Sequence, residues 1–68
     1  MNQTTLANKT KLSLSFISMV LNGKRDAGRR AAAILVKAVP GTIIMDWLFA
    51  KKNHKRLARL VTSIQQED

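Results

Sequence analysis

The amino-acid sequence predicts an all-α domain of four to five short helices. Apolar residues recur at three- and four-residue spacing, and strand-like alternation never extends beyond three or four residues. Turn-forming residues interrupt these stretches at 22–28 and at Pro40–Gly41. The 68 residues, 46% of them hydrophobic, are enough for one modest core and too few for two.

The first two helices are expected on either side of a tight turn. Asn2 can cap a helix that runs from about Gln3 to Lys9. Ser13 can cap a second helix in the same way. The second helix stops at Gly23, because glycine readily takes the left-handed conformation that ends many helices.

The second helix has two different sides. Its apolar stripe consists of Ile17, Val20 and Leu21. The other side carries short, uncharged and mostly hydrogen-bonding side chains, namely Leu14, Ser15, Ser18 and Asn22. A helix that enters the major groove of DNA, about 12 Å wide, needs such side chains toward the base edges and cations at its margins for phosphates. The cations that could occupy these margins are Lys9, Lys11, Lys24 and Arg25.

A third helix is expected over residues 27–39, where alanines are frequent. Asp26 precedes it and suits the positive end of its dipole. Nearly all of its second half is apolar, so we expect it to be buried on several sides and to form the central element of the bundle. Pro40 and Gly41 end it.

Two further helices are expected after this break. Thr42 can cap the fourth, from Ile43 to about Ala50. Its inward residues are expected to be Ile44, Trp47 and Leu48. Asn53 can cap the fifth, from His54 to Gln66. Its apolar residues at helical spacing are Leu57, Leu60, Val61 and Ile64.

The charge of the chain indicates a polyanionic partner. Twelve Lys and Arg residues oppose four Asp and Glu residues, which gives a formal net charge of +8. The cations fall in two clusters, at 9–30 and at 51–59. Three roles are open to the second cluster: a solvated face, a second contact with the DNA backbone, or a contact with anionic membranes. Its members are Lys51, Lys52, Lys55, Arg56 and Arg59.

The residues needed for catalysis, metal binding or cofactor binding are not found together. The chain has no cysteine, and His54 is its only histidine and has no adjacent carboxylate, so we expect neither a catalytic triad nor a zinc site. No glycine-rich phosphate loop occurs, and nothing indicates a small-molecule ligand. The longest apolar run, Ala31–Val36, is far shorter than the roughly 20 residues that span a bilayer. Residues 2–5 do not resemble a secretory signal, so a cytoplasmic protein of bacterial or phage origin is expected.

Several short motifs occur in the order and spacing of one known family. They are Leu6-Ala7, Leu12-Ser13, Ser15-Phe16-Ile17-Ser18, Asn22-Gly23-Lys24-Arg25 and Trp47-Leu48. On these motifs, residues 2 to about 49 resemble the phage repressor and Cro-type helix-turn-helix proteins, also called the Xre or lambda-repressor-like family. The resemblance implies a lambda-repressor-like helix-turn-helix bundle of four to five helices, with residues 1–50 as the DNA-binding domain.

The resemblance also implies two groups of residues at a DNA interface. Those expected to contact bases are Leu14, Ser15, Phe16, Ser18 and Met19. Those expected to hold phosphates are Gln3, Asn22, Lys24, Arg25, Arg29 and Arg30. For Leu14 and Met19 the alternative is a core or dimer contact, and for Ser15 and Ser18 it is a solvated helix surface.

The chain departs from the family pattern at three places. Lys11 stands where the turn usually has glycine, and a left-handed lysine costs roughly 1–2 kcal/mol. Leu14 stands where relatives often have glutamine, so it offers contact with a thymine methyl rather than a bidentate bond to adenine. Relatives also carry a helix ahead of the pair. We expect the basic amphipathic segment 51–68 to cover the corresponding face, either in cis or by exchange between two chains.

These observations predict a sequence-specific DNA-binding regulator that reads the major groove with helix 13–21. In the family that the chain resembles, repression is the commonest mode. A homodimer on a two-fold site is expected, with half-sites about 34 Å apart, because one helix reads only a few base pairs. One alternative is an antitoxin-like or phage accessory module whose apolar C-terminal stripe engages a foreign chain. The other is a basic amphipathic peptide on anionic membranes.

Overall fold

Five helices make up the regular structure of residues 1–64, the part of the chain that this computed structural model describes. In chain order they are α1 (Gln3–Thr10), α2 (Leu14–Leu21), α3 (Arg29–Ala38), α4 (Ile44–Leu48) and α5 (Ala50–Ser63). No strand occurs among these residues, so the predicted all-α bundle is confirmed. Within the same residues, none of the helices has the length and apolar character needed to cross a bilayer.

The starts of α1 and α2 are set by the two polar residues that the sequence indicates. Oδ1 of Asn2 accepts a hydrogen bond from the Thr5 amide at 2.8 Å, and Oγ of Ser13 accepts one from the Phe16 amide at 3.0 Å. Each bond satisfies an amide that has no partner within the first helical turn. Lys11 joins the two helices with φ of 63°, in the left-handed region. The predicted caps and the left-handed turn are confirmed.

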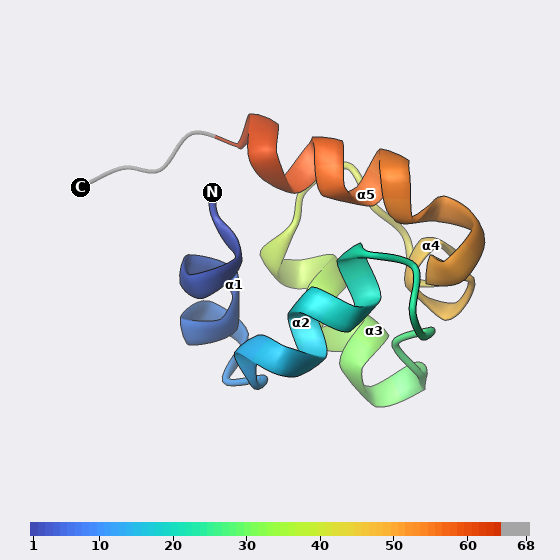
Figure 1. The fold of residues 1–68 in the computed structure, drawn as a ribbon, viewed down its shortest axis with the longest axis horizontal. Coiled ribbons are helices and arrows are strands. Elements are labelled where there is room, and N and C mark those ends of the chain that lie inside the picture. The colour runs from blue at the N-terminus through green and yellow to red at the C-terminus, as the bar shows by residue number, and fades with distance from the viewer. Residues whose placement is uncertain (65–68) are drawn as a thin grey trace.

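The helices enclose one core. Figure 1 shows α1 on the left, α2 across the front, α5 along the top and α4 at the right-hand end. α2 packs against α1 and α5, α3 packs mainly against α4 and α1, and α4 packs against α5. The largest fully buried side chains come from all parts of the bundle: Leu6, Ile17, Val20, Leu35, Val39, Trp47, Leu57 and Val61.

The buried indole of Trp47 explains why Thr42 is not the cap of α4. The indole Nε1 donates a hydrogen bond to Oγ1 of Thr42 at 3.0 Å, and that hydroxyl donates to the Val39 carbonyl at 2.7 Å. A buried indole N–H needs a partner, and Thr42 supplies it. The start of α4 is stabilised instead by Asp46, whose Oδ2 accepts from the Ile43 amide at 2.9 Å.

The boundary between α4 and α5 also differs from the prediction. α4 ends at Leu48, and α5 begins at Ala50 because the amides of Lys52 and Asn53 already donate to the Phe49 carbonyl. Asn53 therefore lies inside α5 and caps nothing; its Nδ2 donates to the Asp46 carbonyl at 3.3 Å.

The expected burial of α4 is only partly right. Trp47 is fully buried and Leu48 is partly buried, as predicted, but Ile44 is 46% exposed. The reason is that α4 has only five residues, and the side that carries Trp47 and Asp46 is the one turned inward.

The third helix is shorter and less central than predicted. It begins at Arg29, because Gly28 has φ of 82° and the Ala27 amide donates to the Trp47 carbonyl. Asp26 does not face its N-terminus; Oδ1 of Asp26 accepts from the Lys51 amide in the first turn of α5, at 3.0 Å. Ile34 is exposed, so α3 is not buried on several sides. It packs mainly on two neighbours, which leaves one of its sides uncovered.

The C-terminal helix folds back onto its own chain. Leu57 and Val61 are buried, and Leu60 and Ile64 pack against the core, so the predicted apolar stripe of α5 faces inward. The Met1 amino group donates to the Ile64 carbonyl, which brings the first residue against the end of α5. α5 therefore belongs to the same core as residues 1–50. Residues 65 and 66 of the expected helix lie outside the described part of the chain.

Candidate nucleic-acid interface

The second helix presents an open surface opposite its buried stripe. Ile17, Val20 and Leu21 are buried, whereas Leu14 is 47% exposed and Ser15 is exposed. Ser18 is half-buried and Met19 is 39% exposed. We call the surface formed by Leu14, Ser15, Ser18 and Met19 the α2 face. It combines two hydroxyls with two flexible apolar side chains and carries no charge.

A shallow depression of about 520 Å³ runs between the α2 face and the start of α1. Its lining residues are Gln3, Thr4, Leu14, Ser15, Ser18 and Met19. The structure thus brings Gln3, predicted as a phosphate contact, beside four of the five predicted base-contacting residues. Thr4 was not predicted. Its signal in the sequence is its position next to Gln3, in the first turn after the Asn2 cap.

The last turn of α2 orients Ser18 and Asn22 together. Nδ2 of Asn22 donates a hydrogen bond to Oγ of Ser18 at 3.2 Å, across one helical turn. Asn22 is exposed and ends the helix. One predicted phosphate contact and one predicted base contact are therefore linked directly.

Phe16 occupies a different environment from the α2 face. Its ring is partly buried and packs against the core, and the guanidinium carbon of Arg25 lies 4.7 Å from the ring centroid. Nε of Arg25 donates to the Asp26 carbonyl at 3.3 Å. The ring thus supports the guanidinium through a cation–π contact, which holds Arg25 beside α2.

The chain leaves α2 through a tight glycine turn. Gly23 has φ of 73°, its amide donates to the Val20 carbonyl at 3.2 Å, and the Lys24 amide donates to the Met19 carbonyl at 2.8 Å. The His54 ring of α5 lies directly over the turn: a Cβ atom added to Gly23 would be 2.5 Å from Cδ2 of His54. Gly23 is therefore required by the backbone and by the approach of α5. Sequence reasoning found only the first requirement.

The other predicted phosphate residues lie beyond this turn. Lys24 is exposed and follows Gly23 directly, so it stands at the C-terminal end of α2. Arg29 and Arg30 are the first two residues of α3 and are also exposed. The 22–28 loop separates these two arginines from α2 along the chain.

Part of the cationic cluster on α5 lies next to the α2 exit. The Lys51 amide bonds to Asp26, and His54 covers Gly23, so this edge of α5 adjoins the 22–28 loop. Lys55 is four residues after Lys51 and so lies on the same ridge of the helix. Lys52, two residues before His54, lies on nearly the opposite side of α5. Sequence reasoning listed these cations but did not separate them.

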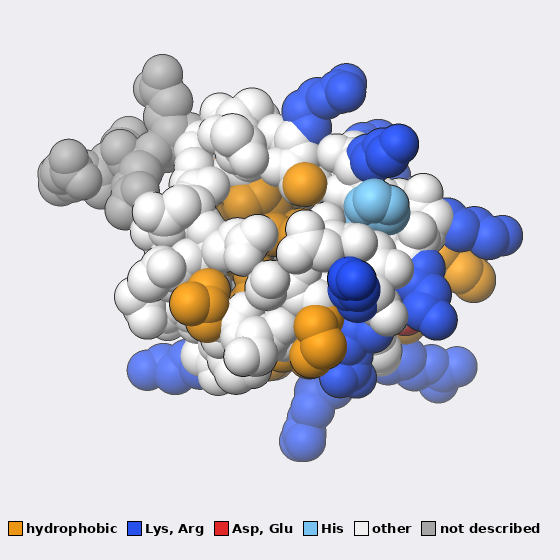
Figure 2. Space-filling view, viewed as in Figure 1, with side chains coloured by type: hydrophobic (Ala, Val, Ile, Leu, Met, Phe, Trp, Pro, Cys, Tyr) orange, Lys and Arg blue, Asp and Glu red, His pale blue; other side chains and the backbone are white. Residues whose placement is uncertain are grey.

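Positive charge surrounds the α2 face with little opposition. The only acidic residues among residues 1–64 are Asp26 and Asp46, and both are engaged: Asp26 with the Lys51 amide, Asp46 with the Arg56 guanidinium and the Ile43 amide. In Figure 2 the surface over α2 is mostly uncharged, while Lys and Arg side chains project along α5, at the right-hand end and along the lower margin. The pattern is an uncharged surface with a cationic border.

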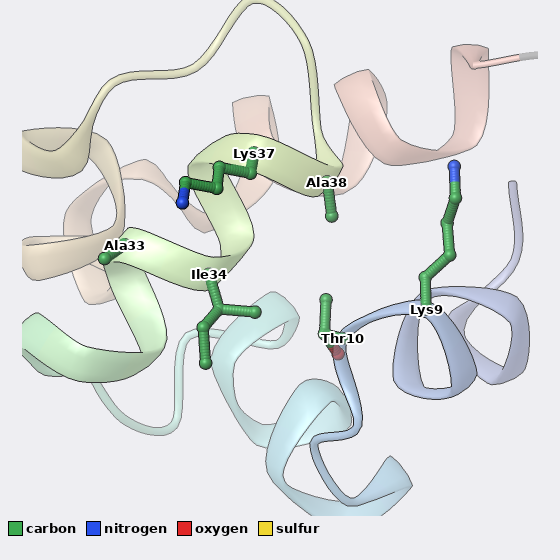
Figure 3. A pocket seen from close by; sticks show the side chains of 6 residues that line it. All are labelled: Lys9, Thr10, Ala33, Ile34, Lys37 and Ala38. Carbon is green, nitrogen blue, oxygen red and sulfur yellow. The ribbon is translucent and has the colours of Figure 1, made fainter.

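A second depression, of about 430 Å³, lies between α1 and α3. Its lining includes Lys9, Thr10, Ile34 and Lys37, but Figure 3 shows the two lysine side chains running in different directions. The Thr10 hydroxyl already donates to the Leu6 carbonyl at 2.7 Å. The depression therefore has no converging polar groups. Among the described residues, no group of His, Cys, Asp or Glu could hold a metal ion.

Comparison of the chain with protein-family models, with curated proteins and with solved structures finds no match. Membership of the Cro-type family stays a prediction from the motifs quoted above.

Proposed function

We propose that this chain is a sequence-specific DNA-binding regulator that inserts α2 into the major groove. The observation that supports this most strongly is the α2 face: an uncharged, partly hydroxylic helix surface that is open to solvent and bordered by cations. Base edges are read by hydrogen bonds and apolar contacts, whereas phosphates are held by cations and amides. The arrangement of charge matches this division of roles.

Each group of side chains has a defined task in this proposal. The hydroxyls of Ser15 and Ser18 donate to or accept from base edges, and Leu14 and Met19 contact thymine methyl groups. Gln3 and the Ser18-bound Asn22 fix the register on one strand. Lys24 and Arg25 neutralise phosphates at the helix exit, and each neutralised phosphate steepens the dependence of affinity on salt.

The proposed biological role is regulation of transcription by binding at a promoter. Repression by excluding polymerase is the commonest mode in the family that the chain resembles, and the residues themselves do not distinguish it from activation; either mode places the protein in the cytoplasm, where the DNA is. A two-fold site bound by a homodimer doubles the number of bases read. The competing antitoxin-like module needs an apolar C-terminal stripe that engages a foreign chain. Leu57 and Val61 are instead buried in this chain's own core, which favours the DNA-binding proposal.

Selection of duplexes from a random-sequence pool tests the proposal. The full chain is used at about 0.05 M and about 0.2 M salt, since the cationic contribution weakens between these concentrations. We expect enrichment of a defined, two-fold related sequence at both concentrations. A pool that binds without any enrichment, and only at the lower salt concentration, would reduce the protein to a nonspecific polyanion binder and contradict the proposal.

A further inference from the structure

Four large apolar side chains are exposed together at α4. Ile43 is 61% exposed, Ile44 46%, Met45 55% and Phe49 47%, and they lie within seven consecutive residues. The Phe49 amide donates to the Met45 carbonyl, so the last two belong to one helical turn. We call these four residues the α4 patch. Monomeric proteins rarely expose contiguous apolar surfaces of more than a few hundred Å², and such surfaces mark interaction sites.

We propose that the α4 patch binds the α4 patch of a second copy of this chain. The charge of the molecule supports self-contact at this place. At a net charge of +8, most of the surface of one copy repels another, whereas the α4 patch itself contains no charged residue. The acid in the same helix, Asp46, is buried and paired with Arg56, so it offers nothing to a cationic partner. An apolar surface of the same kind is the complement, and a second copy provides one.

The position of the patch suits a two-fold dimer on DNA, a step that depends on the proposed function. α4 lies at one end of the long axis of the molecule, while α2 crosses the middle of the front (Figure 1). A two-fold axis beside α4, perpendicular to the long axis and parallel to the direction in which the α2 face points, leaves both α2 faces on the same side. Their separation is then about one molecular length, and the long axis measures 31 Å. This is close to the roughly 34 Å between successive major grooves on one side of B-DNA.

The area of the patch predicts a weak dimer. A standard interface buries about 800 Å² on each partner, roughly a sixth of the 4640 Å² surface of this chain. The four side chains can supply the apolar centre of such an interface, and the 40–42 turn and the start of α5 must supply its rim. We therefore expect dissociation in the micromolar range or above, with DNA completing the assembly.

Salt distinguishes this contact from DNA binding. Added salt screens the repulsion between two cationic copies and leaves apolar burial intact, so self-association strengthens. The same change weakens binding to DNA, because the counterions released from the phosphates gain less entropy when the salt concentration is higher. Opposite responses to salt are thus the signature of two separate surfaces.

Sedimentation equilibrium of the full chain tests the inference at about 0.1 M and about 0.5 M salt. The patch variant is Ile43→Thr with Met45→Gln. The matched control is Leu14→Gln with Met19→Gln, which also removes two exposed apolar side chains without changing the charge. We expect the wild-type chain and the control to dimerise more strongly at the higher salt concentration. The patch variant should dimerise at least about tenfold more weakly. A thermal melt of each chain checks that all three are folded.

Two results would overturn the inference. One is a wild-type chain that stays monomeric at both salt concentrations up to about 1 mM. The other is a patch variant that dimerises as strongly as the control. Neither result bears on DNA recognition, which is measured separately as the affinity of each chain for a selected half-site. A wild-type chain that dimerises but does not recognise the selected half-site would refute the proposed function and leave the dimer contact at the α4 patch in place.

Discussion

The α2 face and the α4 patch both expose large apolar side chains, yet their surroundings differ. On α2, Ser15 and Ser18 lie between Leu14 and Met19 along the chain, and cations border the surface. On α4, apolar residues follow one another without a polar side chain between Ile43 and Met45. Apolar exposure alone does not identify a partner; the neighbouring groups do. The first surface suits a partner that is charged at its edges and mixed at its centre, and the second suits an apolar one.

The largest expected effect is a loss of folding stability at the Gly23 turn, which ends α2 next to the α2 face and is separate in the sequence from the α4 patch. Gly23→Ala introduces a strained left-handed residue and a Cβ only 2.5 Å from the His54 ring. We expect a loss of roughly 3 kcal/mol in the free energy of unfolding, from strain and displacement together. Chemical denaturation measures it.

The control for this change is Gly41→Ala. Gly41 has φ of 90°, but no atom lies within 4 Å of an added Cβ, so this variant carries the backbone strain alone. Combining Gly23→Ala with His54→Ala should bring the loss down to the level of the control. Equal losses for the two single glycine variants would show that the His54 contact is unimportant.

The next effect separates the two surfaces by sequence specificity. Ser15→Ala with Ser18→Ala removes the hydroxyls of the α2 face, and we expect affinity for a selected duplex to fall roughly tenfold to a hundredfold. Affinity for a scrambled duplex should not change, because phosphate contacts remain. Fluorescence anisotropy with both duplexes measures the difference. An equal fall for both duplexes would mean that the serines do not read bases.

A smaller effect extends the cationic border onto α5. Lys51→Ala with Lys55→Ala should make the slope of log affinity against log salt shallower by nearly two units, if both lysines neutralise phosphates. Lys37→Ala with Lys52→Ala removes the same charge from the depression between α1 and α3 and from the side of α5 opposite His54, and should leave the slope nearly unchanged. Identical slopes for the two variants would assign the α5 cluster to solvent.

The smallest effect concerns the turn that joins α1 to α2. Lys11→Gly relieves the left-handed strain at φ of 63° and offsets part of the gain through the greater chain entropy of glycine. We expect a net gain of about 0.5–1 kcal/mol and a melting temperature raised by roughly 3–6 °C. An unchanged or lower melting temperature would show that Lys11 makes contacts that compensate for its strain.

Local signals were sufficient to predict the α1–α2 pair. Asn2, Ser13 and Gly23 each act on amides or carbonyls within a few residues, so their roles can be read without knowledge of the rest of the fold. The apolar stripe of α2 and the exposure of Leu14 and Ser15 follow from helical periodicity in the same way.

The same kind of reasoning failed where a polar residue serves a distant partner. Asp26 bonds to Lys51, Thr42 to the Trp47 indole, and Asn53 to the carbonyl of Asp46. In the sequence Thr42 and Asn53 look like helix caps, and Asp26 looks like a residue at the positive end of a helix dipole, yet each is used by a group that the tertiary fold brings close. The same limit explains why the approach of His54 to Gly23 was missed, and why Ile44 was expected inside.

An NMR titration of the labelled chain with a selected duplex tests the central claim most directly. If α2 enters the major groove, a duplex that carries a single half-site shifts the amides of residues 14–19 and 22–25 most, and residues 43–49 shift only as protein concentration rises. Large shifts at 43–49 upon DNA addition, with residues 14–19 unchanged, would contradict the assignment of the α2 face to DNA.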